Sequence, residues 1–300
     1  MTNQESPALA PKRPDIEIAR LVSAFGIVWF HAEGTQSPVA YAGLIFYIML
    51  SVFLSGSRII DYQSIQRRFF RIIVPWFLWF LVYAAANFFA GKPVVNVESG
   101  WMAGVLAGPS IHLWYMPYIF LVLLLFDVVK NNFSVHTVAG LSLLSGAAMF
   151  LVGASWRPLS VQLGYPIAQW MHALPAVLFG VFIYYFRSLT PIQLGLGVFL
   201  TGWSLLMSGL DLRFGLPYLV GSAAMIAIAA GWFSPRIGFD LLPLSECTLG
   251  IYLSHTAFQK LLANMGLPPG AVLATLSFFL SLTFVFLARK HSVFFRRYMS

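Results

Sequence analysis

The sequence predicts an all-α membrane protein, a bundle of about ten transmembrane helices with both termini in the cytoplasm. Of its 300 residues 59% are hydrophobic and only 9% are charged, and the mean hydropathy is +0.80. A soluble protein carries about 25% charged residues, so this composition excludes a soluble fold. The apolar runs continue for about 17 residues or more without alternating, which favours helices over a membrane β-barrel.

Ten apolar segments are expected to span the membrane, or nearly so, as helices. In order they cover residues 15–32, 40–57, 69–90, 113–130, 138–155, 168–186, 191–210, 215–233, 246–263 and 270–288. The first resembles the short apolar region of a signal peptide, but it lacks a small-residue cleavage site, so we expect it to be retained. The membrane domain is therefore expected over 15–288, between a disordered tail at 1–14 and a basic cytoplasmic tail at 289–300.

The positive charges indicate both the topology and the class of partner. With the N-terminus inside, most of the 18 lysines and arginines fall in cytoplasmic segments, and only Lys92, Arg157 and Arg213 fall outside. This bias is typical of the positive-inside rule. Because the positives flank apolar spans, the net charge of +8 indicates a membrane protein and not a nucleic-acid partner. The single cysteine, Cys247, excludes an intrachain disulfide.

Arg20 and His31 form the sharpest ionisable pair within the expected spans, where charged groups are costly and are functional candidates. At about 100° per residue they share one face of the first helix, about 16 Å apart along its axis. The spacing predicts Arg20 towards the cytoplasm and His31 near the outer end. The structural alternative is an ion pair between Arg20 and Glu17, with a histidine that merely ends the helix, and spacing alone does not separate the two.

Three arginines, Arg67, Arg68 and Arg71, stand at the cytoplasmic mouth of the third expected span. Such a cluster is typical of a positive-inside anchor. It also fits a phosphate-bearing ligand, because guanidinium groups present fixed forks of donors to phosphate oxygens.

Four features of the sequence occur together: the Arg20-x10-His31 pair and the segments Arg67 to Trp76, His112 to Met116 and Gly250 to His255. Through these features the chain resembles the acyltransferase-3 family of integral membrane O-acyltransferases. The resemblance covers nearly the whole chain. It implies a ten-span core in the cell inner membrane that moves an acyl group, commonly acetyl from acetyl-CoA, to a hydroxyl of an extracytoplasmic glycan such as surface polysaccharide, O-antigen or peptidoglycan.

On this interpretation acyl-CoA is a co-substrate and no cofactor is tightly bound. The expected partners are acyl-CoA, an extracytoplasmic glycan or lipid-linked saccharide, and membrane lipid. The cluster of Arg67, Arg68 and Arg71 is expected to hold the donor phosphates. His31 is expected to act as general base on the acceptor hydroxyl, because a neutral imidazole suits base catalysis near pH 7. Arg20 is expected to steady the thiolate or the phosphates, or to orient the helix.

Further residues are candidates for support. Glu33 could hold the His31 tautomer if the helix ends first. His112 could bind the acceptor or stabilise the oxyanion, or it could be a core histidine. His255 could line an acyl channel, or it could simply bond to Tyr252. His172 is expected to be an interfacial residue. Acceptor specificity is expected to depend on the outer loops 91–112 and 153–168.

Several other chemistries receive no support. No close histidine spacing predicts a metal site, and no Gly-x-Ser-x-Gly segment predicts a serine acyl-enzyme, so direct transfer in a ternary complex is preferred. A transporter, or an acyl-group translocator serving a separate transferase, is the alternative class, although the two halves show no matching interrupted helices. A structural subunit of a polysaccharide synthase is the third possibility.

Overall fold

The computed structural model is helical throughout the part of the chain that it describes. The described residues are 13–33, 37–55, 61–95, 97–98, 100–185, 190, 202, 212–233, 235 and 238–299. The first half contains α1 (Pro14–His31), α2 (Ser37–Ala40), α3 (Ala42–Phe53), α4 (Tyr62–Arg68), a π-helical turn η1 (Phe69–Ile73), α5 (Val74–Phe89), α6 (Trp101–Ala107) and α7 (Tyr115–Asn132). The second half contains α8 (Val135–Leu151), α9 (Gly153–Gln162), α10 (Ile167–Tyr184), α12 (Leu212–Ala229), α13 (Leu242–Ser245), α14 (Thr248–Asn264), α15 (Ala271–His291) and α16 (Val293–Tyr298).

The all-α prediction is confirmed over these ranges, and the apolar helices are those of a membrane protein. Three described helices are long and apolar enough to cross a bilayer, at Tyr62–Phe89, Ile167–Tyr184 and Ala271–His291, or four if the bent pair α8 and α9 is one span. Only 17% of the apolar window in Tyr62–Phe89 and 33% of that in Ala271–His291 is buried inside the protein. Their remaining apolar side chains lie on the surface, where lipid is the solvent that accepts them. The count of ten spans and the side of each terminus stay predictions.

Two expected spans differ from regular membrane helices. Within 40–57, α3 has only 12 residues and is about 18 Å long, shorter than a hydrocarbon core of about 30 Å. Within 138–155, the helix ends after Leu151, and α9 continues at an angle of 82°. The break falls where Val152, with ψ of 15°, leaves helical geometry and glycine follows. The expected span 191–210, apart from residue 202, and most of the tail 1–14 lie outside the described residues.

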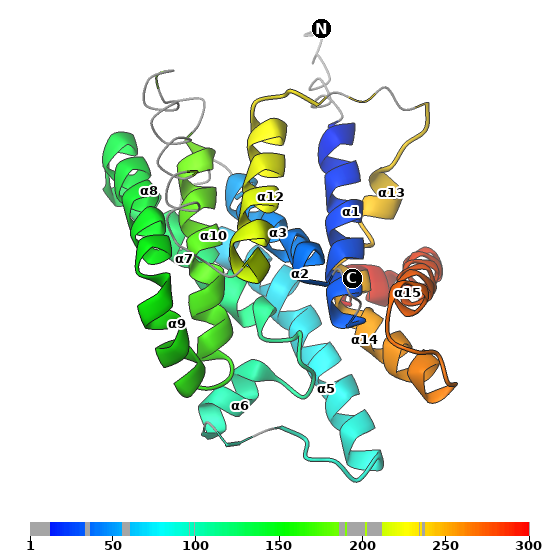
Figure 1. Cartoon of the computed structure of the whole chain (residues 1–300). Helices are drawn as coiled ribbons and strands as arrows, with labels where there is room; N and C mark the ends of the chain where they lie inside the picture. The colour runs from blue at the N-terminus through cyan, green and yellow to red at the C-terminus, as the bar shows by residue number, and fades with distance from the viewer. Residues whose placement is uncertain are drawn as a thin grey trace, which may run out of the picture.

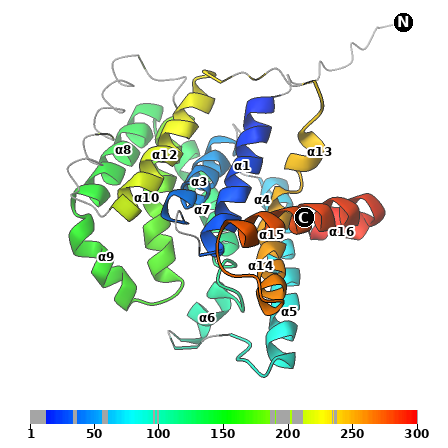
Figure 2. The same cartoon turned by 45° about the vertical axis from the view of Figure 1, so that its right-hand side comes forward.

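The helix α3 is the centre of the bundle. Most of its side chains are buried, and α1, α10 and α12 pack around it (Figure 1). In the turned view, α14, α15 and α16 lie on the other side of α1 from α12, and α6 and α9 stay at the lower edge (Figure 2).

Glycine sets the crossing of α1 and α3. A Cβ at Gly43 would lie 2.5 Å from the backbone oxygen of Ser23, and a Cβ at Gly26 would lie 2.9 Å from the backbone oxygen of Ala40. No side chain fits at such distances, so the two backbones touch directly, as small residues allow between membrane helices. This contact fixes the position of α1, and with it the position of His31 at its lower end.

The three arginines predicted as a cluster lie near a local irregularity. The helix from Tyr62 to Phe89 begins with a capping box, in which Asp61 Oδ1 accepts from the backbone N–H of Ser64 at 2.6 Å. This hydrogen bond lowers the pKa of Asp61. The π turn at Phe69–Ile73 contains Arg71 and comes just before Pro75, which has no N–H to continue the helical ladder.

Candidate active site

Three histidines from distant parts of the chain meet at the lower end of α1. The ring centroid of His255 lies 5.1 Å from that of His31 and 5.0 Å from that of His112, and the His31 and His112 centroids are 6.3 Å apart. His31 ends α1, His112 lies in the turn before α7, and His255 lies within α14. All three were candidates from the sequence, and the fold brings them together.

His112 is held rigidly in the protein interior. Its Nε2 donates to the carbonyl oxygen of Leu253 at 3.3 Å. Because a carbonyl only accepts, Nε2 carries the proton and Nδ1 is an acceptor. Ser110 Oγ donates to Nδ1 at 3.2 Å, whereas Thr256 Oγ1, 3.3 Å away, gives its single hydrogen to Tyr83. Tyr252 donates its hydroxyl hydrogen to the backbone oxygen of His112. These bonds fix one tautomer and one ring orientation.

His255 is fixed at one nitrogen and open at the other. Its Nδ1 lies 2.7 Å from the carbonyl oxygen of Tyr252 and 3.2 Å from that of Ile251, so Nδ1 carries the proton. Its Nε2 therefore has a lone pair, and this atom is buried without a hydrogen-bond partner among the described residues. A buried acceptor without a donor costs free energy, and the His31 ring is an immediate neighbour.

His31 borders an internal cavity of about 440 Å³. The side chain is half-buried, and its ring makes no hydrogen bond to another described residue. His112 and Tyr252 line the same cavity, and Arg157, Gln169 and His172 also line it. The volume lies in the range of small-molecule sites, roughly 300–1,000 Å³. His31 is thus placed to touch a ligand, with His255 behind it.

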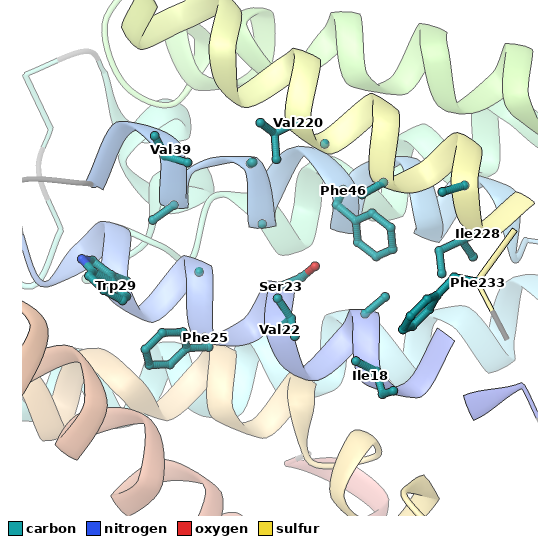
Figure 3. Close-up of a pocket in the computed structure, with 18 of the residues that line it drawn as sticks. Ile18, Val22, Ser23, Phe25, Trp29, Val39, Phe46, Val220, Ile228 and Phe233 are labelled. Atoms are coloured by element: carbon teal, nitrogen blue, oxygen red, sulfur yellow. The ribbon is translucent and has the colours of Figure 1, made fainter. Parts of the chain in front are cut away.

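A larger cavity, of about 590 Å³, lies elsewhere and is apolar. Figure 3 shows it between α1, α3 and α12, with Ile18, Val22, Phe46 and Val220 among its lining side chains. None of the three clustered histidines lines it. Of these two cavities, only the smaller one is bordered by histidines of the cluster.

Arg20 is placed by an ion pair within α1. Its Nη1 is 3.6 Å from Glu17 Oε2, and Glu17 accepts a hydrogen bond from Ser245 of α13. His31 contacts His255 of α14, whereas Arg20 is connected to α13 through Glu17. The ion pair of the structural alternative is present within α1, and the hydrogen bond from Ser245 to Glu17 joins α1 to α13.

Glu33 takes no part in the histidine cluster. The helix ends at His31, as a role for Glu33 requires, but Glu33 is exposed and has a φ of 52°. Its carboxylate forms no hydrogen bond or ion pair with a described residue.

The arginine cluster divides into one fixed and two exposed side chains. Arg68 forms an ion pair with buried Asp127, which Lys130 also pairs at 2.9 Å, and it donates to the carbonyl oxygen of Leu123 at 2.9 Å. Arg67 and Arg71 are exposed. Arg68 thus anchors η1 to α7, whereas Arg67 and Arg71 are accessible to a ligand.

Within the described ranges, no set of three or more His, Cys, Asp or Glu side chains is placed to hold a metal ion. The histidine cluster instead has donors and acceptors matched to carbonyl and hydroxyl groups. This arrangement suits proton transfer, because His255 keeps a lone pair on Nε2 and the neighbouring His31 ring borders the cavity.

Comparison with protein-family models gives a match to the acyltransferase domain of the acyltransferase-3 family over residues 13–290. The chain belongs to the acyltransferase-3 family. This membership makes the protein a membrane acyltransferase, and the matched range contains the whole histidine cluster. No curated protein and no solved structure matched the acyltransferase in the corresponding comparisons.

Four residues at the site of this acyltransferase were not singled out in the sequence. Ser110 donates to His112 Nδ1. Tyr83 accepts from Thr256 Oγ1 at 2.7 Å and donates to the same Leu253 carbonyl oxygen as His112. Gln169 lines the cavity from α10. Hydroxyl residues and a lone glutamine are common everywhere, so only the tertiary contact distinguishes them.

Proposed function

We propose that this protein is a membrane O-acyltransferase that moves an acetyl group from cytoplasmic acyl-CoA to a hydroxyl of an extracytoplasmic glycan or lipid-linked saccharide. The observation that carries the proposal is the position of His31. Its side chain is half-buried at the cavity of about 440 Å³, and its ring centroid lies 5.1 Å from that of His255. The Nε2 atom of His255 has a lone pair with no hydrogen-bond partner among the described residues. The predicted ten spans, with both termini in the cytoplasm and the protein in the inner membrane, belong to this proposal.

In the proposed reaction, His31 takes the proton of the acceptor hydroxyl as its oxygen attacks the thioester carbonyl carbon. The new C–O bond forms, the C–S bond breaks, and the CoA thiolate leaves with its electron pair. The thiolate then receives the proton, so no oxidant or reductant is needed. General base catalysis of this kind contributes about 10² to 10⁴ in rate.

His255 supports this proton transfer in the proposal. When His31 becomes an imidazolium, both of its nitrogens are donors. The lone pair on His255 Nε2 can then accept one of these hydrogens, which stabilises the charged form where it is needed. His112, whose proton is committed to Leu253, holds the neighbouring wall in place.

The donor is proposed to enter from the cytoplasmic side, with Arg67 and Arg71 on its phosphates and Arg68 holding η1 against α7. Arg20 is assigned the orienting role, because it pairs with Glu17, which accepts a hydrogen bond from Ser245 of α13. No residue is assigned to a tightly bound cofactor.

The test uses purified protein in detergent, with acetyl-CoA and a candidate glycan, and measures thiol release and acetylated product. His31→Ala is expected to abolish transfer and to keep donor binding, whereas His291→Ala, at an exposed histidine, leaves both unchanged. His255→Ala is expected to slow transfer without removing it. Normal transfer by His31→Ala would refute the catalytic assignment.

Donor binding has a separate test. Replacing Arg67 and Arg71 together by alanine is expected to weaken acetyl-CoA binding, and the matched pair Lys290→Ala and Arg297→Ala, also exposed, is not. Equal affinity in the two double variants would contradict the donor site.

A translocator that passes acetyl groups to a separate transferase is the second candidate, favoured by the broken helix pair α8 and α9, since interrupted spans occur in transporters. Product formation by the purified protein alone decides between them. A translocator would release no acetylated glycan without its partner enzyme.

A further inference from the structure

The wall of the cavity formed by α9 and α10 carries a polar group to which the reaction described above assigns no role. Gln169 lies in the first turn of α10 and lines the same 440 Å³ cavity as His31. Its Oε1 atom is buried and has no hydrogen-bond partner among the described residues. Buried amide oxygens are nearly always bonded, so this atom calls for a donor that enters with a ligand.

Two of the three phenol hydroxyls that line the cavity are committed elsewhere, and the third, on Tyr41, makes no hydrogen bond to Gln169 Oε1. Tyr165 donates its hydrogen to the backbone oxygen of Ile111 at 2.8 Å, and Tyr252 donates to that of His112. Each phenol has a single hydrogen, so both are committed to backbone carbonyls. The two rings, together with Trp114, give the cavity aromatic surfaces on which the apolar face of a sugar ring can pack.

We infer that Gln169 binds the acceptor, and that its Oε1 accepts a hydrogen bond from an acceptor hydroxyl other than the one that is acylated. The inference rests on the proposed function and adds a substrate requirement to it. A hydroxyl has one hydrogen, and the reacting hydroxyl gives its hydrogen to His31. The acceptor therefore needs a second hydroxyl, which places sugars and other polyols, and not simple alcohols, in the substrate class.

The geometry also assigns a specificity role. His31 lies at the end of α1 and Gln169 lies at the start of α10, so the two groups hold the acceptor from different helices. Only a hydroxyl at the matching distance and angle from the bound one is presented to His31. Gln169 thus selects which position of the ring is acylated.

The first experiment measures acetyl transfer from acetyl-CoA to methyl glycosides of glucose, galactose and mannose by the full-length protein in detergent. Gln169→Leu is expected to raise KM for the glycoside by about tenfold, equivalent to about 1.4 kcal/mol, a typical loss for one hydrogen bond. Gln169→Glu keeps an acceptor oxygen and should restore most of the affinity. Gln162→Leu, at an exposed glutamine of α9, is the matched control.

Monodeoxy glycosides make the test specific. Loss of one particular hydroxyl is expected to weaken binding to the wild type by about tenfold. Loss of the same hydroxyl should not weaken binding to Gln169→Leu any further, because the two changes remove the same hydrogen bond. Equal deoxy penalties in the two proteins would overturn the inference, as would a KM of Gln169→Leu within about twofold of wild type.

A binding measurement separates this inference from the proposed function. Titration calorimetry of the same glycosides on His31→Ala and on His31→Ala with Gln169→Leu reads the site without chemistry. Weaker binding by the double variant supports the Gln169 site, even if the wild type transfers no acetyl group and the proposed function fails. Equal binding by the two, or no binding of any glycoside, overturns the Gln169 site.

Discussion

The contact between Gly43 of α3 and Ser23 of α1 predicts a large effect from a single methyl group. In Gly43→Ala the new Cβ would lie 2.5 Å from the Ser23 backbone oxygen, about 1 Å closer than the 3.4 Å at which ordinary contact begins. The obstacle is backbone, so no side chain can rotate away, and α1 must move from α3 by about that distance. Overpacking of this kind costs roughly 1–3 kcal/mol.

The same shift displaces His31, because α1 carries it. A misplacement of about 1 Å at reacting groups can cost roughly 100-fold in rate. We therefore expect Gly43→Ala to lower both the thermal unfolding midpoint in detergent and the rate of acetyl transfer. Gly140→Ala on α8 is the matched control, since nothing lies within 4 Å of its Cβ and alanine favours the helix. If the two variants unfold at the same temperature and transfer equally fast, the argument that glycine sets this crossing is wrong.

Two further predictions concern the helix from Tyr62 to Phe89. Arg68→Met should destabilise the protein in chemical or thermal unfolding, by at most about 3 kcal/mol because Lys130 still pairs Asp127; an unchanged midpoint would refute the anchor role of Arg68. Because its hydrogen bond to Ser64 lowers the pKa of Asp61, the cap should stabilise this helix fully above the ordinary pKa of 3.8 and lose that effect as the pH falls through the lower folded value. Hydrogen exchange in the first helical turn checks this, and Asp61→Asn, which still accepts a hydrogen bond, should show no such pH dependence.

Much of the local structure follows from the sequence. Apolar runs predict where α7 and α15 begin to within about two residues, because a helix in lipid must satisfy its own backbone groups. Helical periodicity predicts that Arg20 and His31 share a face of the first helix, and the structural alternative, an ion pair between Arg20 and Glu17, is present. The resemblance to the acyltransferase-3 family is confirmed by the match over most of the chain.

The parts that the sequence did not predict depend on tertiary contact. Hydropathy cannot distinguish a lipid-facing span from a buried one, so α3 was expected to be longer than its 12 residues. The bend after Leu151 depends on a single residue leaving helical geometry. Gln169 shows the limit most clearly, because its significance lies in a missing hydrogen bond that only the fold reveals.

The distribution of the histidine cluster along the chain has a consequence for biosynthesis. His31 and His112 leave the ribosome early, whereas His255 follows only when more than four-fifths of this sequence has been made. Amino-terminal segments enter the membrane first and wait for their later partners. A truncated product that stops before α14 would insert its opening helices but leave His31 without His255 and His112 without the carbonyl of Leu253. Packing of α14 against α1 is thus the assembly step that completes the histidine cluster.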